Sequence, residues 1–210
     1  MTISFWLILL AVIAYGLLHS FLASLKIKAQ ARRWFGPDTD RWFRLAYNLI
    51  AVFTLLPILL LPILLKDREI YVIRYPWVIL TLILQVLAVI VLIVGLRQTG
   101  ITPFIGLRQL LLPEDTSPPR LVTAGLYCYV RHPLYAAGLV IIWLIPILTW
   151  NLLALYLGLT AYIFIGANFE ERKLRLEFGE AYSEYCHHTP MLIPGSNNLY
   201  IRSQNIDHRT

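Results

Sequence analysis

Charged residues leave four long stretches of this sequence empty. No Asp, Glu, Lys or Arg occurs in residues 1–25, 45–65, 75–96 and 132–169. A helix needs about 20 apolar residues to cross the hydrocarbon core of a bilayer. The first three stretches therefore fit one membrane helix each, and the fourth is long enough for two. Only 14% of the residues are charged, against about 25% in an ordinary soluble domain, which excludes a soluble enzyme with a single core.

The fourth stretch has a natural break near its middle, where Pro146, Trp150 and Asn151 combine a proline, an interfacial aromatic and a polar turn residue. We therefore expect an all-α, polytopic membrane protein, with residues 1–210 forming one membrane domain. Its five transmembrane helices are expected at residues 1–25, 45–65, 75–96, 133–149 and 152–169. The first stretch is treated as a helix and not as a signal peptide, because no positive charge precedes it and it is longer than a signal peptide's apolar region.

The lysines and arginines predict how these helices are oriented. Fifteen of the 18 lie in residues 26–44, 97–131 and 170–210, which five helices place on one side of the membrane. The positive-inside rule then predicts an external N-terminus and a cytoplasmic C-terminus. The net charge of +6 suits membrane lipids with anionic headgroups. It does not indicate nucleic acid, because no basic cluster alternates with stacking aromatics beyond what a membrane interface explains.

Neither cysteine predicts a disulfide or a metal site. Cys128 and Cys186 both fall on the expected cytoplasmic side, where thiols stay reduced. His187 and His188 directly follow Cys186, but consecutive residues on a helix or strand point in different directions. We therefore expect no bound metal, and no pattern in the sequence predicts an oligomeric state.

The loop of residues 98–132 ends in a polar motif. Pro133 is expected in the first turn of the fourth helix, where its missing N–H costs nothing. Arg131 and His132 then lie at the N-terminus of that helix, where a cation is mildly unfavourable and requires an anionic partner. The alternative is a pair of side chains that reach from the membrane boundary into water.

The tail carries the second polar feature. Glu170 and Glu171 are expected directly after the last membrane helix, where the helix dipole does not favour acids. One of them can pair with Lys173 or Arg175 on a helix surface. The spacing of the apolar residues predicts an amphipathic helix that Gly179 interrupts. We expect residues 170–195 to form a cytoplasmic helical lid and residues 196–210 to be a frayed tail.

Three ordered blocks carry a resemblance to a known family. They are Gly125-Leu126-Tyr127-x-x-Val130-Arg131-His132-Pro133-x-Tyr135, then Glu170-Glu171, then Phe178-Gly179-x-x-Tyr182-x-x-Tyr185. Together they resemble the isoprenylcysteine carboxyl methyltransferase superfamily. Further motifs are similar to its branch of methanethiol S-methyltransferase and NnrU-like membrane proteins: His19-Ser20, Phe35-Gly36, Arg44-x-x-Tyr47-Asn48 and Phe104-Ile105-Gly106-Leu107-Arg108-Gln109.

The resemblance implies that S-adenosyl-L-methionine is bound at the cytoplasmic ends of the last two helices, under the tail. The implied cofactor-binding residues are Gly125, Tyr127, Val130, Arg131, His132, Tyr135, Glu170 and Glu171. Their chemistry fits: an arginine can bind the cofactor's carboxylate, with a histidine assisting. A glutamate can accept its ribose hydroxyls or ammonium, and tyrosines can flank its adenine or sulfonium.

The expected function is an integral-membrane methyltransferase that methylates the sulfur of a small or lipophilic thiol. His19 and Arg108 are the candidate catalytic residues, and His19, Arg108 and Gln109 are the candidate substrate contacts. A thiol must lose its proton to become nucleophilic, which a nearby cation favours. Two alternatives stay open: an NnrU-like membrane factor without enzymatic activity, and a related membrane reductase that uses NADPH.

Overall fold

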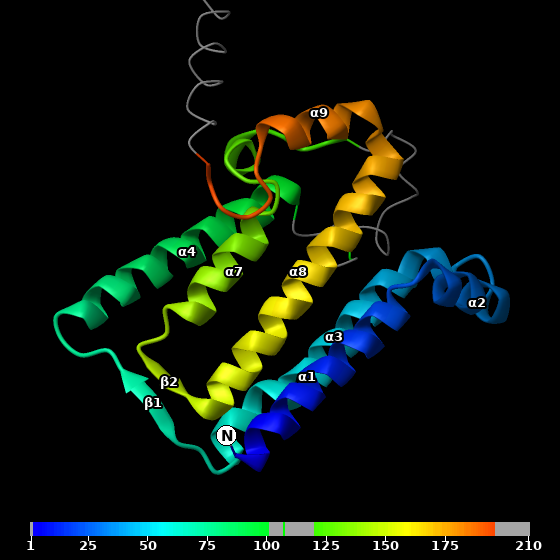
Figure 1. Cartoon of the computed structure of the whole chain (residues 1–210). Coiled ribbons are helices and arrows are strands. Elements are labelled where there is room, and N and C mark those ends of the chain that lie inside the picture. The colour runs from blue at the N-terminus through cyan, green and yellow to red at the C-terminus, as the bar shows by residue number, and fades with distance from the viewer. Residues whose placement is uncertain (1, 101–106, 108–119, 196–210) are drawn as a thin grey trace, which may run out of the picture. The chain divides into compact units, whose positions relative to one another are not determined.

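The computed structural model describes residues 2–100, 107 and 120–195, and within these it is predominantly helical (Figure 1). The chain forms two compact units. The first comprises residues 1–80, 100–117 and 145–162, and the second comprises residues 81–99, 118–144 and 163–210. Helices α4 (Trp77–Thr99) and α8 (Trp150–Phe178) contribute residues to both units. The expected helical fold class is confirmed.

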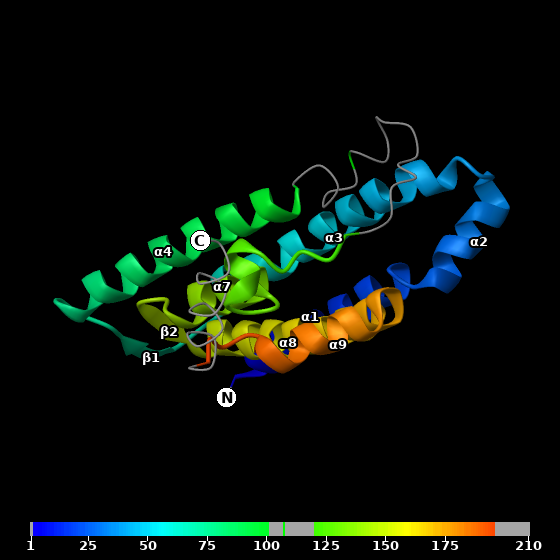
Figure 2. The same cartoon turned by 90° about the horizontal axis from the view of Figure 1, so that it is seen from above.

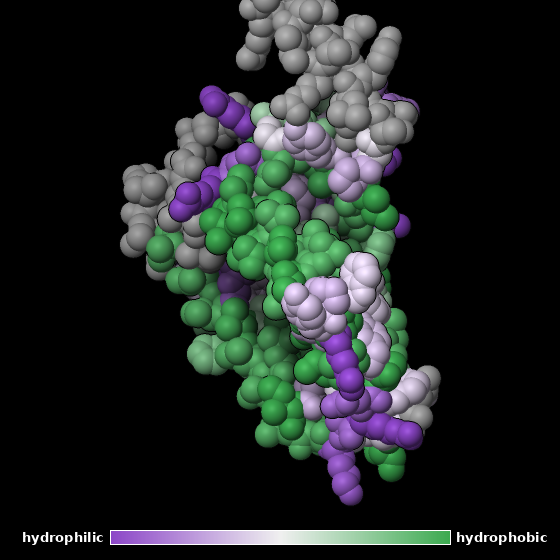
Figure 3. Space-filling view, turned by 90° about the vertical axis from the view of Figure 1, so that its left-hand side faces the viewer, coloured by the Kyte–Doolittle hydropathy of each residue, from purple (hydrophilic) through white to green (hydrophobic). Residues whose placement is uncertain are grey.

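Among the described residues, four helices are long and apolar enough to cross a membrane: α1 (Ile3–Leu22), α3 (Thr39–Leu64), α4 and α8. Figure 3 shows one face of the protein, on which many of the described side chains are hydrophobic. The protein is therefore an integral membrane protein, as expected. The fifth apolar helix, α7 (Pro133–Trp143), has 11 residues. At 1.5 Å per residue it is about half as long as the bilayer core is thick, so the fifth crossing stays a prediction.

The first unit contains α1, α2 (Leu25–Phe35) and α3, which follow one another with short connections. Thr2 and Ser24 cap the first two helices, because their hydroxyls accept hydrogen bonds from the amides of Phe5 and Ile27. Gly36 ends α2 with a φ of +82°, which a glycine adopts without strain.

A small antiparallel sheet of β1 (Glu69–Val72) and β2 (Ile147–Thr149) also belongs to the first unit. Glu69 pairs with Thr149, and Val72 pairs with Ile147. Next to the sheet, the fully buried Asn151 donates to the carbonyls of Leu65 and Lys66 at 3.3 Å each. The start of α8 is thereby tied to the end of α3.

The helices differ from the expected ones in ways that have physical causes. Helix α2 occupies part of a segment expected to be a loop, because Ser24 provides a cap. Helix α7 ends at Trp143, although it was expected to continue to residue 149, and the segment around Pro146 leads into β2. Helix α8 continues to Phe178, because the residues after 169 are mostly good helix formers and Gly179, with a φ of +55°, is the first to end it.

In the second unit, α4 packs against α7 and the one-turn helix η1 (Gly125–Cys128). Gly95 leaves room for Leu134, because an added Cβ would lie 2.8 Å from that side chain. Gln85 donates to the carbonyl of Ile141 at 2.9 Å. Helix α9 (Glu180–His188) follows α8. The residues after α9, 189–195, return to the start of α7 and are called the return segment below.

Candidate functional site

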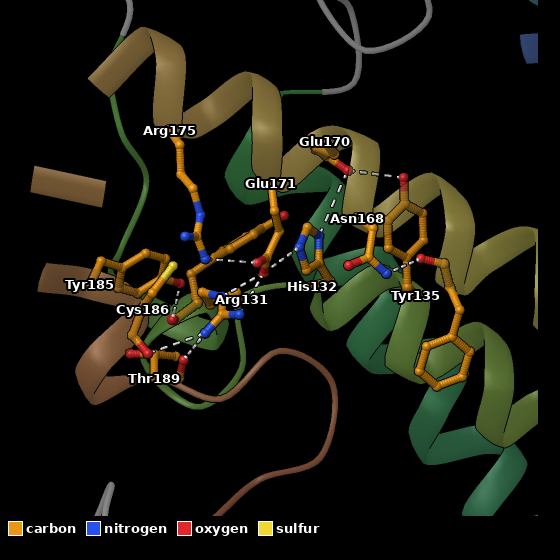
Figure 4. A network of polar contacts seen from close by, with 12 residues as sticks. Arg131, His132, Tyr135, Asn168, Glu170, Glu171, Arg175, Tyr185, Cys186 and Thr189 are labelled. Carbon is orange, nitrogen blue, oxygen red and sulfur yellow. Dashed lines mark hydrogen bonds and ion pairs between the residues drawn. The ribbon is translucent and has the colours of Figure 1, made fainter. Parts of the chain in front are cut away.

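The second unit contains a buried ion pair between Arg131 and Glu171 (Figure 4). The Nη2 of Arg131 lies 2.6 Å from Glu171 Oε1, and its Nε donates to the same oxygen at 2.7 Å. Both side chains are only 10% exposed. Arg131 lies just before α7, whereas Glu171 lies 40 residues later in α8. The pair therefore joins two elements that are distant in the sequence.

Arg131 also holds the return segment. Its Nη1 donates to the carbonyl oxygens of Cys186 at 3.3 Å and Thr189 at 2.5 Å. The backbone amide of Arg131 donates to the carbonyl of Pro190 at 2.9 Å, and that of His132 donates to Met191 at 3.1 Å. A guanidinium has five N–H donors, and at least four are used here. Arg131 thus binds groups of the protein itself, and its expected contact with the cofactor's carboxylate stays a prediction.

The charge of Arg131 is secure at any physiological pH. Burial works to lower the pKa of its guanidinium, but the hydrogen bond and the negative charge of Glu171 outweigh burial and raise that pKa. An arginine held by a carboxylate and two carbonyls is a rigid support for its neighbours.

His132 links the two glutamates. It is the N-cap residue of α7, and its ring is 5% exposed. Its Nε2 lies 3.3 Å from Glu171 Oε1, and its Nδ1 lies 3.7 Å from Glu170 Oε2. The ring of Tyr135 stacks on it with 5.4 Å between centroids, and the Tyr135 hydroxyl donates to Glu170 Oε2 at 3.0 Å. One histidine and one tyrosine thereby orient the Glu170 carboxylate.

The two adjacent glutamates have different environments. The side chain of Glu171 is 10% exposed and is surrounded by Arg131 and His132, with Arg175 3.9 Å away. The side chain of Glu170 is 47% exposed. Only Glu170 can therefore offer a carboxylate to a ligand without first breaking a buried ion pair.

The expected residues Gly125, Tyr127 and Val130 lie next to this network. Gly125 has a φ of +67°, and a Cβ there would collide with the side chain of Gln98, whose Oε1 accepts from the amide of Leu126 at 3.1 Å. Val130 is 6% exposed. Burial, followed by the charge of Glu170, raises the pKa of the Tyr127 hydroxyl, which a hydrogen bond with Thr99 partly offsets. Tyr127 thus stays a neutral donor and acceptor near Glu170.

The tail is also attached through Tyr185 of α9, whose hydroxyl donates to the carbonyl of Tyr127 at 2.5 Å. Tyr182, on the same helix, is 1% exposed. Burial raises the pKa of both hydroxyls, so both are neutral. Helix α9 is therefore attached to the rest of the second unit through its own aromatic side chains.

The first unit contains a separate polar cluster around His19 of α1. The hydroxyl of Tyr162 lies 2.5 Å from His19 Nδ1, and the hydroxyl of Tyr47 contacts both ring nitrogens, with 3.1 Å to Nδ1. The ring of Tyr15 lies 5.7 Å from that of His19. All four residues belong to helices that are long and apolar enough to cross a membrane. We call this set the His19 cluster.

The remaining expected residues, Arg108 and Gln109, lie outside the described residues. Within the described part of the chain, no group of three or more His, Cys, Asp or Glu side chains is arranged to hold a metal ion. The network around Arg131 and the His19 cluster are therefore the two candidate functional sites among the described residues.

Comparison with known proteins places the network around Arg131 within a family match. Residues 74–181 match the model of the phospholipid methyltransferase family. The match includes Arg131, His132, Tyr135, Glu170 and Glu171 and covers about half of the chain. The chain belongs to this family.

Curated relatives of this phospholipid methyltransferase family member have similar names. Methanethiol S-methyltransferase 1 of Bradyrhizobium diazoefficiens is 40% identical over 92 residues, which are 42% of this chain and 32% of that protein. Methanethiol S-methyltransferase of Crocosphaera subtropica is 38% identical over 92 residues, covering 42% and 36%. The protein of that name from Mycobacterium tuberculosis is 35% identical over 92 residues, covering 42% and 38%. The chain thus matches about a third of the length of these relatives. No solved structure gives a significant match.

The expected resemblance to membrane methyltransferases is confirmed, and membership of the phospholipid methyltransferase family implies a methyl donor. Reasoning from sequence did not find Tyr162, Gln98 or the carbonyls of Cys186 and Thr189 as parts of these sites. The carbonyls carry no sequence signal, because every residue has one. Tyr162 occurs in an apolar helix rich in aromatics, and only the fold shows that it faces His19.

Proposed function

We propose that this protein is an integral-membrane methyltransferase that uses S-adenosyl-L-methionine. The network of Arg131, His132, Tyr135, Glu170 and Glu171 supports this proposal most directly. It lies inside the segment matched by the family, outside the apolar part of the helices, and it leaves one oriented carboxylate exposed. Bound there, the cofactor supplies a methyl group on an electron-poor sulfonium.

The residues of the network fit the parts of this cofactor. Glu170 can accept hydrogen bonds from the ribose hydroxyls or the ammonium. The rings of Tyr135 and Tyr127 provide aromatic surfaces for the adenine or the sulfonium. The carboxylate of the cofactor needs a cation, and Arg175 offers a guanidinium whose side chain is 56% exposed. Arg131 and Glu171 act as positioning residues, because they hold His132 and the return segment.

We propose the tail as a lid over the cofactor. The return segment is hydrogen-bonded to Arg131 and His132, and α9 is attached to η1 through Tyr185. A chain truncated before Glu170 should insert into the membrane and fail to bind the cofactor. Normal cofactor affinity in that truncated chain would reduce the tail to a surface anchor.

The proposed orientation keeps this tail in the cytoplasm, and an active cytoplasmic reporter fused after Thr210 would support it.

The acceptor proposed is a small or lipophilic thiol. The relatives named above are called methanethiol S-methyltransferases, and an apolar thiol partitions to the membrane where this protein resides. The thiol must be deprotonated before it attacks. His19, hydrogen-bonded by two tyrosine hydroxyls, is the proposed proton acceptor, and Arg108 and Gln109 are the proposed thiol contacts.

Calorimetric titration of the full chain in detergent tests the cofactor. Binding of S-adenosyl-L-methionine supports the proposal, binding of NADPH alone would favour a membrane reductase, and binding of neither would favour an NnrU-like factor. Glu170→Gln is the variant of the site. Glu180→Gln, at an exposed position of α9, is the matched control, and its affinity for the cofactor should be unchanged.

Turnover tests the acceptor. The protein should methylate methanethiol at a rate that rises with pH, because the thiolate is the nucleophile. Arg108→Ala should lower that rate while the cofactor affinity stays unchanged. Turnover with a long-chain lipid acceptor alone would reassign the acceptor and leave the cofactor site intact.

A further inference from the structure

Helix α2 is held at a membrane boundary by the helices on either side of it. It begins three residues after α1 ends at Leu22, and it ends four residues before α3 begins at Thr39. Figure 2 shows α2 crossing from the end of α1 to the start of α3. Both neighbours are long and apolar enough to cross a membrane. Because α2 joins the two at one end, it lies where hydrocarbon meets water.

The surface of α2 carries three large exposed apolar side chains. Leu25 is 83% exposed, Trp34 is 72% exposed and Phe35 is 65% exposed. Tryptophan is enriched at the level of lipid headgroups, where its ring is amphipathic. Exposed apolar residues on an otherwise polar helix are typical of helices that lie in the plane of the interface.

Its charges are all positive, and half of them form no ion pair with the described residues. Asp40 at the start of α3 lies 2.8 Å from Lys28 and 3.2 Å from Arg32. Helix α2 itself carries no acid. Lys26 and Arg33 form no ion pair within the described part of the chain. They are seven residues apart, so they share one side of the helix.

We propose that α2 is an interfacial helix that binds anionic phospholipids of the bilayer through Lys26 and Arg33. Trp34 follows Arg33 about 100° further around the helix, so its ring reaches the acyl boundary while the two cations stay among the headgroups. An anionic headgroup provides the negative charge that Asp40 provides for the other two cations. A zwitterionic headgroup carries no net charge and satisfies the pair less well. This surface is independent of the proposed methyltransferase activity.

The test compares lipids retained by the full chain after purification in detergent micelles that contain equal phosphatidylcholine and phosphatidylglycerol. Mass spectrometry gives the ratio of the two retained lipids. Removing two interfacial charges, with Lys26→Gln and Arg33→Gln together, should lower the enrichment of phosphatidylglycerol on the order of tenfold. The matched control removes Lys66 and Arg68, which lie beyond the other end of α3, and should retain the enrichment.

An equal loss in both double variants would overturn the proposal, because net charge alone would then explain the binding. An unchanged ratio in the Lys26 and Arg33 variant would overturn it as well. If the double variant does not fold by circular dichroism, each single substitution is measured and should lose part of the enrichment. Trp34→Ala should weaken the retention of both lipids without changing their ratio, since it removes an apolar anchor and no charge.

Discussion

The two polar clusters of this protein bury their groups in different ways. The network around Arg131 is built from charges, with a guanidinium, two carboxylates and backbone carbonyls within hydrogen-bonding distance. The His19 cluster is built from neutral hydroxyls around one imidazole. The first lies where α7 begins and α8 has left its apolar part. The second belongs to helices that are long and apolar enough to cross a membrane.

The difference follows from the free-energy cost of placing a charge in each environment. A charge inside the hydrocarbon of a bilayer is expensive, so His19, in the last turn of the apolar helix α1, is satisfied by neutral hydroxyls, which can donate to it or accept from it. Outside the apolar region, charges can be kept if each has a partner. In the charged network, the Glu170 side chain is also 47% exposed, so its carboxylate is accessible to a ligand, as the proposed cofactor site requires.

The largest expected effect comes from breaking the charged network. Arg131→Ala leaves Glu171 buried without its partner, and removal of one member of a buried pair costs about 3–5 kcal/mol. The free energy of unfolding in detergent should fall accordingly. Arg175→Ala removes an exposed guanidinium 3.9 Å from the same carboxylate and should cost less than about 1 kcal/mol. Equal losses in the two variants would contradict the assigned support role of Arg131.

The next prediction separates the adjacent glutamates. Glu170→Gln should weaken S-adenosyl-L-methionine binding at least tenfold, because a charge-assisted contact to a ligand is worth about 1.5–3 kcal/mol. It should leave thermal unfolding almost unchanged. Glu171→Gln should mainly lower the unfolding temperature. It should affect cofactor binding only indirectly, because His132 loses the support of the Glu171 carboxylate. Calorimetry and thermal melts on both variants check this, and the reverse pattern would exchange the two roles.

A third prediction uses pH. Burial, then the charge of Glu171, raises the pKa of Tyr182 in the folded protein above its unfolded value of about 10. The neutral hydroxyl therefore stabilises the fold fully below pH 10. Above that, the unfolded state loses its proton first, and stability should fall by up to about 1.4 kcal/mol per pH unit for this group until the folded pKa is passed. Tyr182→Phe should make the alkaline decline shallower, and an unchanged slope would contradict the assignment.

The smallest effect is expected in the His19 cluster. Tyr162→Phe removes a neutral hydrogen bond between membrane helices, and such bonds average about 0.6 kcal/mol. Unfolding measurements should show a loss of that order, with unchanged cofactor affinity. If His19 accepts the proton of the acceptor, His19→Gln should also change the pH profile of turnover, which a purely structural histidine would not do. Tyr15→Phe is the control, because Tyr15 contacts His19 through its ring and not through a hydrogen bond.

The sequence by itself determined the membrane character of this protein. Long stretches without charge predict helices in a bilayer, because a helix satisfies all the backbone hydrogen bonds of an apolar segment within the hydrocarbon. The ordered motifs from Gly125 to Tyr135 and at Glu170 and Glu171 predicted a methyltransferase resemblance, which the family match confirms. These signals each depend on residues that are close together in the sequence, so they can be recognised without knowledge of the fold.

Only the tertiary structure decided what each polar residue contacts. Glu170 and Glu171 are neighbours in the sequence, yet one is half exposed and the other is buried, because consecutive helical residues face about 100° apart and only one faces Arg131. Tyr162 meets His19 across 143 positions of the chain. Arg131 is engaged by carbonyls of the return segment, which have no residue-specific signal. Contacts of this kind depend on how helices pack against one another, and a sequence pattern does not contain that information.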